Sequence, residues 1–542
     1  MADANPADLK ILIADKLAPE GLDLLKDAGI AFDEKVGLSE DELAAIVGEY
    51  DGLAVRSGAK VTEKVLAKPG KLKAIARAGV GVDNIHLPTA TAKGILVVNT
   101  AAASTLSTAE HALALMYALA RQIPAADAHV RGGGWKRGSF KGTQLAGKTL
   151  GVVGLGRIGQ TVATRALAME MDVLGYDPYF KGETALDGRL KVIGDFDEFL
   201  KKLDVITFHV PGGAGTKHLL DANRLKNVAK KTLLVVNDAR GEVVDEFALA
   251  EALKSGDIAG AAIDVFATEP PQKDHPLFGL DNVVLTPHLG ASTEEAQNAV
   301  AVEACRALMA FLLNGEISGA VNLMGVKLDL PSDEAPFADF ASRAGRLLTA
   351  FYGDAGFKTI TVRASGNRAQ KNLETLKRLA AVEMLGAAMD TPVNVVNVEP
   401  AAEERGIELV GIKENSPPSG MTGDIVGVRA GDDATSGHRV LGTAYADGLP
   451  RVLRIDNFAM DLVPAGPMVL IENDDQPGVI GNVGHAFGEA GINIADMVIS
   501  RHENSALMVL KVDQPPTDAL VAKLRGLSNV RRVMTATLPP LS

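Results

Sequence analysis

The chain has 542 residues, and since a domain usually has about 150 residues, this length predicts three or four domains. Hydrophobic residues make up 47% and charged residues 23% of the chain, a balance typical of globular proteins that excludes a disordered or fibrous chain. The formal net charge is −13, which excludes a general binder of nucleic-acid phosphates. The single cysteine, Cys305, excludes an internal disulfide and a thiolate metal site, and we interpret it as a core residue.

The opening segment, Met1 to Pro6, lacks the basic and apolar regions of a secretory signal. No run of about 18 uncharged apolar residues follows it. We therefore expect a soluble, cytoplasmic protein with no membrane partner and no nucleic-acid partner.

Two segments of the chain alternate short strand-like runs with helical stretches such as 39–50, which predicts two parallel α/β sheets. Helical stretches at 107–121 and 293–313 are long enough to bridge the two units and to define a hinged cleft. The strand-like runs are 9–14, 52–56, 72–77 and 95–99 in the first unit, and 149–153, 172–176, 204–210, 232–237, 259–265 and 283–286 in the second.

A Pro/Asp-rich stretch, 321–337, separates these units from a third one with a helix at 374–389 and strands at 359–362, 393–398 and 451–455. The last ~75 residues follow the order strand, helix, strand, strand, helix, strand, which predicts a ferredoxin-like βαββαβ module. Its segments are 468–472, 479–490, 493–500, 506–512, 517–527 and 530–537.

The segment Gly154-Leu155-Gly156-Arg157-Ile158-Gly159 follows an apolar strand and opens a helix, the context that a dinucleotide-binding loop requires. The glycines let the backbone approach a pyrophosphate, and the helix N-terminus supplies N–H groups. Asp177 stands 18 residues after Gly159, at the end of the next strand, where a carboxylate accepts from ribose hydroxyls and repels a 2′-phosphate. This spacing favours NAD over NADP, and the alternative is a structural glycine turn.

Three predicted strands of the second unit end in segments with functional side chains, and ligands of open α/β sheets sit at these carboxyl ends. Removing hydride from a secondary alcohol requires a base, a cation for a substrate carboxylate, and a group that holds the base. His288, Arg240 and Glu269 supply this set, because a carboxylate favours the charged imidazole and so helps it take up a proton. The segments are 237–241, 264–270 and 286–290.

Each of these three residues also has a purely structural interpretation. His288 could cap the helix near Ser292, Arg240 could pair with nearby carboxylates, and Glu269 could be a loop carboxylate. For an isolated histidine the structural interpretation is favoured, so the catalytic hypothesis depends on the three segments together.

These blocks resemble the D-isomer-specific 2-hydroxyacid dehydrogenases, and together with the C-terminal module they resemble the long, multidomain type of that family. The resemblance implies that Arg240, Glu269 and His288 carry the chemistry and that Asp264 contacts the nicotinamide carboxamide. The most specific blocks are Arg56-Ser57, 77–84, 135–142, 154–159, 237–245, 264–270 and 287–293. The implied NAD-binding residues are Gly154, Gly156, Arg157, Ile158, Gly159, Asp177, Val210, Asp238, Ala239, Arg240, Asp264 and His288.

The resemblance implies NAD-dependent oxidation of D-3-phosphoglycerate to 3-phosphohydroxypyruvate, the first step of L-serine biosynthesis, by a homo-oligomer that we expect to be a tetramer. A phosphate and a carboxylate need positive charge and backbone N–H groups. Arg137 is expected to reach the phosphate from a neighbouring subunit, and the 79–81 turn has a structural alternative. The candidate substrate-binding residues are Arg56, Ser57, Val80, Gly81, Asn84 and Arg137.

The segments 473–481 and 491–494 resemble the ACT module, which binds small amino acids across paired domains. Asn473, Asp475 and Asn493 offer the donors and acceptors that L-serine needs as an effector. The alternative is a module that serves only to dimerise the chain.

The segment before this module resembles the intervening domain of the long family members, an allosteric substrate-binding-like domain. Its basic cluster of Arg439, Arg451 and Arg454 could bind an anion, although ion pairs with Asp447 and Asp456 are the favoured interpretation. The implied organisation is a substrate-binding domain at 1–103 and 290–322, an NAD-binding domain at 104–289, the intervening domain at 323–465 and the ACT domain at 466–542.

The chain departs from the family pattern close to the expected active site. Asp238 and Glu242 raise the negative charge around Arg240, and the glycine-rich segment 209–216 puts the rigidity of a cofactor-facing loop in doubt. Two rival functions stay open: another D-2-hydroxyacid dehydrogenase that reduces glyoxylate, hydroxypyruvate or 2-oxoglutarate, and a nucleotide-sensing, corepressor-like binding protein. No metal site is expected, because the histidines lack ligand partners at a recognisable spacing.

Overall fold

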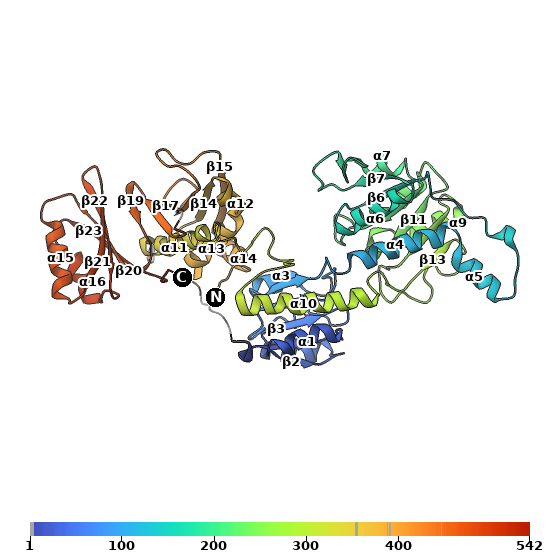
Figure 1. Ribbon diagram of the computed structural model, residues 1–542, viewed down its shortest axis with the longest axis horizontal. Coiled ribbons are helices and arrows are strands. Elements are labelled where there is room, and N and C mark those ends of the chain that lie inside the picture. The colour runs from blue at the N-terminus through green and yellow to red at the C-terminus, as the bar shows by residue number, and fades with distance from the viewer. Residues whose placement is uncertain (1–4, 353–355, 387–388, 390–391, 446, 542) are drawn as a thin grey trace.

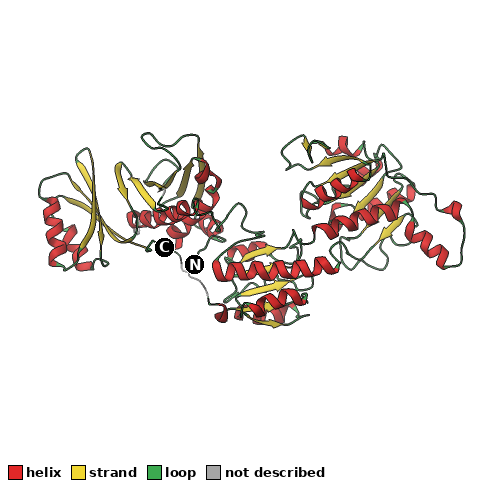
Figure 2. Cartoon of the chain, viewed as in Figure 1, coloured by secondary structure: helices red, strands yellow, loops and turns green. Residues whose placement is uncertain are grey.

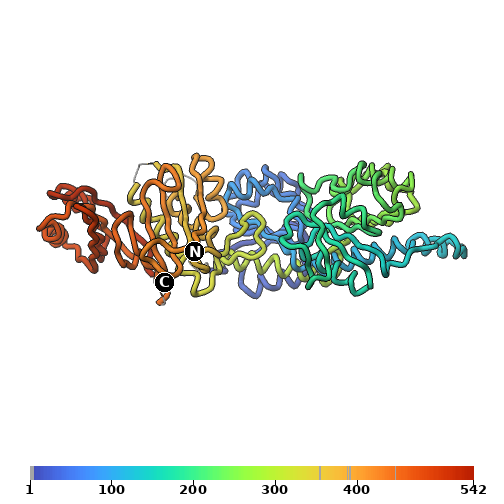
Figure 3. The backbone as a smooth tube through the Cα atoms, turned by 90° about the horizontal axis from the view of Figure 1, so that it is seen from above, coloured from blue at the N-terminus to red at the C-terminus, as the bar shows by residue number. Residues whose placement is uncertain are grey.

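The computed structural model describes residues 5–352, 356–386, 389, 392–445 and 447–541. In this part of the chain the strands form four sheets, and the four units that carry them follow one another along an elongated molecule (Figure 1). The unit with the first sheet lies between the second unit and the third (Figure 3). The fold class is thus the predicted one, with two α/β units followed by two α+β units.

The first unit holds a fully parallel sheet of strand order β2-β1-β3-β4-β5. Its strands are short and, apart from the edge strand β2, almost entirely buried, as expected for a parallel sheet covered on both faces. The strands are β1 (Lys10–Ile13), β2 (Ala31–Glu34), β3 (Gly52–Val55), β4 (Ala74–Arg77) and β5 (Leu96–Asn99). The helices are η1 (Pro6–Asp8), α1 (Pro19–Asp27), α2 (Glu40–Ile46), η2 (Val47–Glu49) and α3 (Leu87–Ala92).

The second unit is a doubly wound sheet of order β13-β12-β11-β10-β6-β7-β9-β8, parallel except for the β8–β9 pair. Strand order reverses beside β6, which is where dinucleotides bind in such sheets. The strands are β6 (Thr149–Val153), β7 (Asp172–Tyr176), β8 (Thr184–Ala185), β9 (Leu190–Val192), β10 (Val205–Phe208), β11 (Leu234–Asn237), β12 (Gly260–Ile263) and β13 (Val283–Leu285). The helices are α4 (Thr105–Ala120), α5 (Ile123–Arg131), η3 (Arg137–Ser139), α6 (Arg157–Ala168), α7 (Phe196–Leu200), α8 (Ala222–Lys226), η4 (Gly241–Val243) and α9 (Glu246–Ser255).

Two long helices connect these units, as predicted (Figure 2). Helix α4 leaves the first unit and packs in the core of the second, whereas α10 (Glu294–Asn314) returns and packs in the core of the first. Gly21 of α1 allows this return, because a Cβ there would lie 2.7 Å from the carbonyl oxygen of Ala301. Cys305 is buried in the same contact, which confirms its prediction as a core residue.

Helix α10 is also long and apolar enough, by length and composition alone, to cross a membrane. Half of its most apolar window is buried inside the structure. Its apolar character is therefore explained by the core that it completes.

The third unit holds a mixed sheet of order β15-β14-β16-β17-β18-β19, in which only the β14–β15 pair is parallel. One face of this sheet is covered by α11 and α13. The strands are β14 (Thr359–Ser365), β15 (Glu408–Glu414), β16 (Ile425–Gly431), β17 (His438–Ala444), β18 (Pro450–Ile455) and β19 (Phe458–Leu462). The helices are α11 (Ala335–Tyr352), α12 (Asn367–Lys371), α13 (Leu373–Gly386) and α14 (Val398–Glu404).

The predicted helix 374–389 corresponds to α13, and its positions 387–388 lie outside the described residues. The predicted strand 393–398 is wrong, since the segment is a turn that leads into α14. The Asn394 side chain causes this, because its Oδ1 accepts from the backbone N–H of Val396 at 2.8 Å and its Nδ2 donates to the carbonyl of Gly94 at 2.9 Å. The turn thereby docks the third unit on the first.

The last unit has the predicted βαββαβ order, with an antiparallel sheet of order β21-β22-β20-β23. One face of the sheet carries α15 and α16, and the other shares a continuous hydrophobic core with the third unit. The elements are β20 (Gly466–Asp474), α15 (Val479–Glu489), β21 (Ile494–His502), β22 (Ser505–Val512), α16 (Asp518–Arg525) and β23 (Val530–Leu538).

The side chain of Arg343 on α11 joins the third unit to the last one. It contacts the chain both where it enters the last unit and where it leaves it. It is 4% exposed, and its guanidinium donates to the carbonyls of Pro464 at 2.9 Å, Pro539 at 2.6 Å and Pro540 at 3.0 Å. The Asp339 carboxylate accepts from its Nε at 2.7 Å. One buried cation thus fixes the strand that enters the last unit and the chain that leaves it.

We expect Arg343→Met to destabilise the C-terminal half of the protein by about 3 kcal/mol, because it leaves three carbonyls and a carboxylate without their charged donor. In differential scanning calorimetry this loss appears as an earlier transition of the two C-terminal units. Arg346→Met is the matched control on the same helix, because that arginine is 42% exposed in its pair with Glu383 and such pairs contribute at most about 1 kcal/mol. Equal effects of the two substitutions would contradict the role given to Arg343.

Candidate active site

The glycine-rich loop between β6 and α6 has the shape that the sequence predicts. Gly154 has φ +90° and lies so close to His209 that a Cβ would be 2.5 Å from its carbonyl oxygen. At Gly159 a Cβ would be 1.9 Å from the carbonyl of Gly154, so α6 and β6 pack only without a side chain there. Gly156, in contrast, has open space in front of it and caps α6 with no side-chain acceptor. This cradle fits the pyrophosphate of a dinucleotide, whose charge the helix N-terminus favours.

Asp177 lies at the carboxyl end of β7, beside this loop. Its two oxygens accept from the backbone N–H groups of Leu155 and Tyr179, both at 2.9 Å. These bonds hold the carboxylate beside the cradle, where a ribose edge is expected. Arg157 is exposed in the first turn of α6, and Ile158 beside it is half-buried.

The buried carboxylate of Asp264 organises the loop after β13. One oxygen accepts from the hydroxyl of Thr286 at 2.6 Å and the N–H of Leu289 at 2.8 Å and lies 3.2 Å from Nε2 of His111, and the other accepts from the N–H of Gly290 at 3.0 Å. Burial alone would raise the pKa of Asp264, but these hydrogen bonds outweigh it and lower the pKa below its ordinary value. Asp264 is therefore a charged anchor for the loop that carries the predicted base.

The predicted base and its carboxylate meet as expected, with Nδ1 of His288 2.8 Å from Oε2 of Glu269. His288 has φ +57°, a conformation that costs free energy and is held here by its N–H bond to the Asp264 carbonyl at 2.8 Å. Burial would raise the pKa of Glu269, yet the hydrogen bonds from His288 and the N–H of Phe266 outweigh it and lower the pKa. Since the imidazole is 48% exposed, its other nitrogen can reach a ligand in the cleft.

Arg240 is aimed into the cleft by a turn that Asn237 stabilises, with its Nδ2 donating to the Arg240 carbonyl at 2.9 Å. The guanidinium crosses to the first unit, where its Nε donates to Asp83 at 3.0 Å. It lies so close to Gly81 that a Cβ there would be 1.7 Å from Nη2. The two units therefore meet at the cation that is predicted to hold a carboxylate.

The two acidic departures, Asp238 and Glu242, each have a structural explanation. Asp238 is 5% exposed, and burial, aided by the charge of Asp264, raises its pKa well above the ordinary value and favours the neutral form. Its Oδ1 lies 3.5 Å from Nδ1 of His209, whose pKa burial lowers to about 3. The direct contact with the cofactor predicted for Asp238 stays a prediction.

Glu242 has a structural partner of its own. Its Oε1 accepts from the backbone N–H of Gly213 at 2.6 Å, so it fixes the glycine-rich loop whose rigidity the sequence leaves in doubt. Val210 begins this loop half-buried, and Ala239 is buried beneath it.

Arg77, at the carboxyl end of β4, is the site residue that the sequence interpretation missed. Its Nε and that of Arg56 are buried and, among the described residues, have no hydrogen-bond partner. Burial, together with the charges of Arg240 and Arg56, lowers the pKa of Arg77 to about 10. The rule that ligands gather at carboxyl ends of strands points to Arg77 as well, because this residue ends β4.

The loop that carries Arg56 is held by a half-buried carboxylate and an amide. Asp15 accepts from the N–H groups of Arg56 at 2.6 Å and Ala59 at 3.0 Å. Asn84 donates to the carbonyls of the same two residues at 2.8 and 2.7 Å. Asn84 thus supports the loop rather than pointing a free amide at a ligand, while Ser57 on the loop is exposed.

The two remaining candidates for substrate binding are Val80, at the cleft, and Arg137, on a projecting arm. Val80 lies beside the Arg240 contact, and its carbonyl accepts from Nδ2 of Asn99 at 2.6 Å. Arg137 lies in the segment after α5, which projects from the far end of the second unit (Figure 1), with its guanidinium stacked on Trp135. In its own chain Arg137 does not join the cleft.

The predicted effector residues do not come together within one chain. Asn473 pairs with Ala506 across β20 and β22, and the same Ala506 pairs with Arg501 near the end of β21. Asn493 precedes the start of β21, and its amide donates to Asp513 at the opposite end of the sheet. Asp475 lies at the Asn473 end, 3.3 Å from Arg501. A site that uses all three residues therefore requires a second copy of this unit.

No group of three or more potential metal ligands occurs among the residues that the structure describes. The donor set of the cleft is instead three arginines, an imidazole and a carboxylate, which suits an anionic organic substrate.

Comparisons with known proteins match three families along the chain. Residues 113–290 match the NAD binding domain of D-isomer specific 2-hydroxyacid dehydrogenases, residues 335–456 the D-3-phosphoglycerate dehydrogenase intervening domain and residues 468–529 the ACT domain. Among solved structures, TT0316 protein from Thermus thermophilus is 35% identical with a TM-score of 0.54, covering 58% of this chain and all of that one. D-lactate dehydrogenase from Aquifex aeolicus, complexed with NAD and lactic acid, is 30% identical with a TM-score of 0.50, covering 56% of this chain and 95% of that one.

Similarity to two D-3-phosphoglycerate dehydrogenases extends over nearly the whole chain. D-3-phosphoglycerate dehydrogenase of Archaeoglobus fulgidus is 39% identical over 530 residues, which is 96% of this chain and 98% of that protein. The enzyme of the same name from Bacillus subtilis is 36% identical and covers 98% of this chain and all of its own length. The chain therefore belongs to the D-3-phosphoglycerate dehydrogenase family of the D-isomer-specific 2-hydroxyacid dehydrogenases.

Proposed function

We propose that this protein oxidises D-3-phosphoglycerate to 3-phosphohydroxypyruvate with NAD, the first step of L-serine biosynthesis. The observation that carries the proposal is that the unit with the His288–Glu269 pair also carries Arg240, whose charge acts, together with that of Arg56, on Arg77 of the first unit. A phosphorylated 2-hydroxy acid has two anionic groups beside the alcohol that must lose a proton, and the cleft has cations for both.

His288 is the group that takes the hydroxyl proton of the substrate, through the ring nitrogen that Glu269 does not bind. Glu269 holds the other nitrogen at 2.8 Å, which fixes the orientation of the ring. Its charge stabilises the imidazolium that forms, so the same proton can be returned in the reverse direction. NAD, when bound, supplies the acceptor for the hydride.

We assign the three arginines to the substrate's carboxylate and phosphate by the distance of each group from the reacting carbon. The carboxylate is attached to that carbon, so it falls to Arg240, which is on the unit that carries His288. The phosphate lies one carbon further away and falls to Arg56 and Arg77 on the first unit. Since the pair between Arg240 and Asp83 is exposed at the aspartate and such pairs are weak, a substrate carboxylate can replace it.

The cofactor side of the cleft is held by the chain's own backbone and carboxylates. The N-terminus of α6 takes the pyrophosphate at Gly156, and Asp177 accepts from the ribose hydroxyls, which favours NAD over its 2′-phosphorylated form. Asp264 keeps the loop of His288 closed against this site, and its contact with the nicotinamide carboxamide remains part of the proposal.

His288→Gln is expected to lower kcat by about 10²–10⁴-fold, the typical cost of losing a general base. NADH affinity, measured by fluorescence titration, should change little, because the side chain acts on the substrate proton. His218→Gln is the matched control, since that histidine is 46% exposed in the same unit. A His288 variant that keeps more than half of the original kcat would refute the assignment.

A comparison of 2-hydroxy acids tests the substrate class. The unmodified enzyme should form NADH faster from D-3-phosphoglycerate than from D-glycerate, glycolate or D-2-hydroxyglutarate, which separates the proposal from the other 2-hydroxyacid dehydrogenases. Arg77→Gln should lower kcat/KM for the phosphorylated acid by about 10- to 100-fold, as expected for a lost charged hydrogen bond, with little effect on D-glycerate. The exposed Arg189 provides the control substitution, Arg189→Gln. Equal losses on both substrates would contradict the phosphate role.

We further propose that the ACT domain binds L-serine between two copies of the chain. Asn473 and Asp475 lie at one end of the sheet and Asn493 at the other, so paired domains would bring one set from each copy together. Ligand binding lowers activity only through different affinities for two states of the enzyme, and typical couplings of ~1–3 kcal/mol allow partial inhibition.

Calorimetry with L-serine should give a heat of binding and a matching loss of rate at millimolar effector, and Asn493→Ala should abolish both. D-serine is the control ligand, because it cannot place its ammonium, carboxylate and hydroxymethyl groups in the same three contacts at once. The absence of both heat and inhibition would leave the domain as a dimerisation element.

The assembly is proposed to be a homotetramer in the cytoplasm. The arm formed by α5 and the loop to Phe140 exposes Ile123, Val130 and Trp135, a surface suited to a contact with a second copy. Such a contact would also bring Arg137 toward a neighbouring cleft.

A further inference from the structure

The glycine-rich segment 209–216, the β10 loop, borders the crevice where a dinucleotide is expected. It follows β10, which lies beside β6 on the side away from β7, so the loop begins where the strand order reverses. A Cβ on Gly154 would lie 2.5 Å from the His209 carbonyl oxygen and 2.8 Å from Cγ1 of Val210. The start of the β10 loop therefore forms one wall of the pyrophosphate cradle.

The β10 loop continues past the catalytic arginine. A Cβ on Gly212 would lie 3.4 Å from Cγ of Arg240 and 2.6 Å from Oε1 of Glu242, so a side chain at Gly212 would displace the Glu242 carboxylate. Gly213 has φ +127°, a backbone conformation that favours glycine. One loop thus contacts both the cofactor cradle and the residue assigned to the substrate carboxylate.

Glu242 holds the β10 loop at two points. Its Oε1 accepts from the backbone N–H of Gly213 at 2.6 Å, and its backbone carbonyl accepts from the N–H of His218 at 2.7 Å. Between these points the loop closes on itself, because the hydroxyl of Thr216 donates to the carbonyl of Pro211 at 2.7 Å. The half-buried carboxylate of Glu242 thereby ties the glycine-rich part of the loop to η4.

A loop of this composition is held in one conformation only at a large cost in entropy. Three of the four residues at positions 212–215 are glycine, which loses more conformational freedom on ordering than any other residue. If only a fraction of the molecules hold the loop in the binding conformation, the affinity for the ligand falls by that fraction. A bond that removes the other conformations therefore raises the affinity without touching the ligand.

We propose that Glu242 is a positioning residue for NAD, because its carboxylate holds the β10 loop in the conformation that lines the cofactor cradle. The acidic departure at position 242 thus compensates for the glycine-rich departure in the loop. This role rests on the proposed place of NAD along the cradle of α6, and it is independent of the identity of the substrate.

Fluorescence titration of the full-length enzyme with NADH tests this role. Glu242→Ala should weaken NADH binding by about five- to tenfold, as expected for one lost hydrogen bond, and should raise KM for NAD by a similar factor with a much smaller change in kcat. Glu242→Gln keeps an oxygen that accepts from Gly213, so it should restore most of the affinity. Glu251→Ala is the matched control, since that carboxylate is 77% exposed on α9.

AMP distinguishes the loop from a general loss of the cofactor site. It carries the adenosine half of NAD, which is expected at Asp177 after β7, on the other side of β6 from the β10 loop. The affinity for AMP should therefore be the same in Glu242→Ala and in the unmodified enzyme. A variant with a damaged domain would lose affinity for both ligands.

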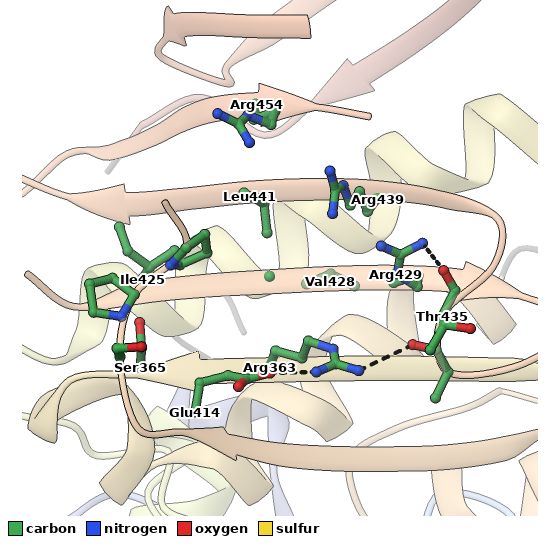
Figure 4. A pocket seen from close by; sticks show the side chains of 15 residues that line it. Arg363, Ser365, Glu414, Ile425, Val428, Arg429, Thr435, Arg439, Leu441 and Arg454 are labelled. Atoms are coloured by element: carbon green, nitrogen blue, oxygen red, sulfur yellow. Dashed lines mark hydrogen bonds and ion pairs between the residues drawn. The ribbon is translucent and has the colours of Figure 1, made fainter. Parts of the chain in front are cut away.

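The arginines of the intervening domain lie away from the β10 loop, on the other side of the first unit (Figure 3). Arg439 and Arg454 line a hollow on the sheet of that domain (Figure 4), whereas Arg451 pairs with Asp447 at 2.8 Å, as the favoured interpretation predicts. AMP is measured by its competition with NADH, so that phosphate groups bound elsewhere in the chain do not enter the result.

Hydrogen exchange reports on the loop without any ligand. Peptides covering 209–218 should exchange faster in Glu242→Ala than in Glu251→Ala, because the N–H of Gly213 loses its acceptor. Equal exchange in these peptides, equal NADH affinities of the two variants, a Glu242→Gln variant as weak as Glu242→Ala, or an equal loss of AMP affinity would each overturn this role alone. Failure of the unmodified enzyme to bind NADH would overturn the proposed function as well.

Discussion

The carboxylate of Asp264 is the constraint on which the active site depends. Asp264 is buried directly after β12. Its carboxylate holds the loop after β13 by accepting from the N–H groups of Leu289 and Gly290. These bonds hold His288 in a left-handed backbone conformation, which is unfavourable without such support. The same loop accepts a hydrogen bond from Ser107 of α4 at 2.9 Å, so the position of the base is tied to a helix that connects the two units.

The first unit carries positive charge on the other side of the cleft. Arg77 is half-buried, its buried Nε has no hydrogen-bond partner in the described structure, and a substrate anion offsets the resulting cost in desolvation on binding. Arg240 has Asp83 as a temporary partner across the cleft. The ligand therefore replaces one weak ion pair and satisfies an unpartnered donor, and both steps favour a substrate with two anionic groups over one with a single carboxylate.

The sequence predicts the parts of this enzyme whose residues are close together in the chain. The glycine loop before α6, the strand ends at Arg240 and His288, and the last βαββαβ unit follow from local spacing. The strand predicted at 393–398 was wrong, because the Asn394 side chain accepts from a backbone N–H that would bond to a neighbouring strand in a sheet. The role of Arg77 and the raised pKa of Asp238 depend on burial in the folded chain, and no local pattern in the sequence reports such burial.

The order of the units along the molecule limits how a ligand at one end can affect the cleft at the other. The ACT sheet shares one hydrophobic core with the intervening domain, and Arg343 fixes both ends of the ACT chain to α11. The intervening domain in turn docks on the first unit through Asn394 and the carbonyl of Gly94, directly before β5. Within one chain, these contacts join the C-terminal pair to the catalytic residues through the unit that carries Arg56 and Arg77.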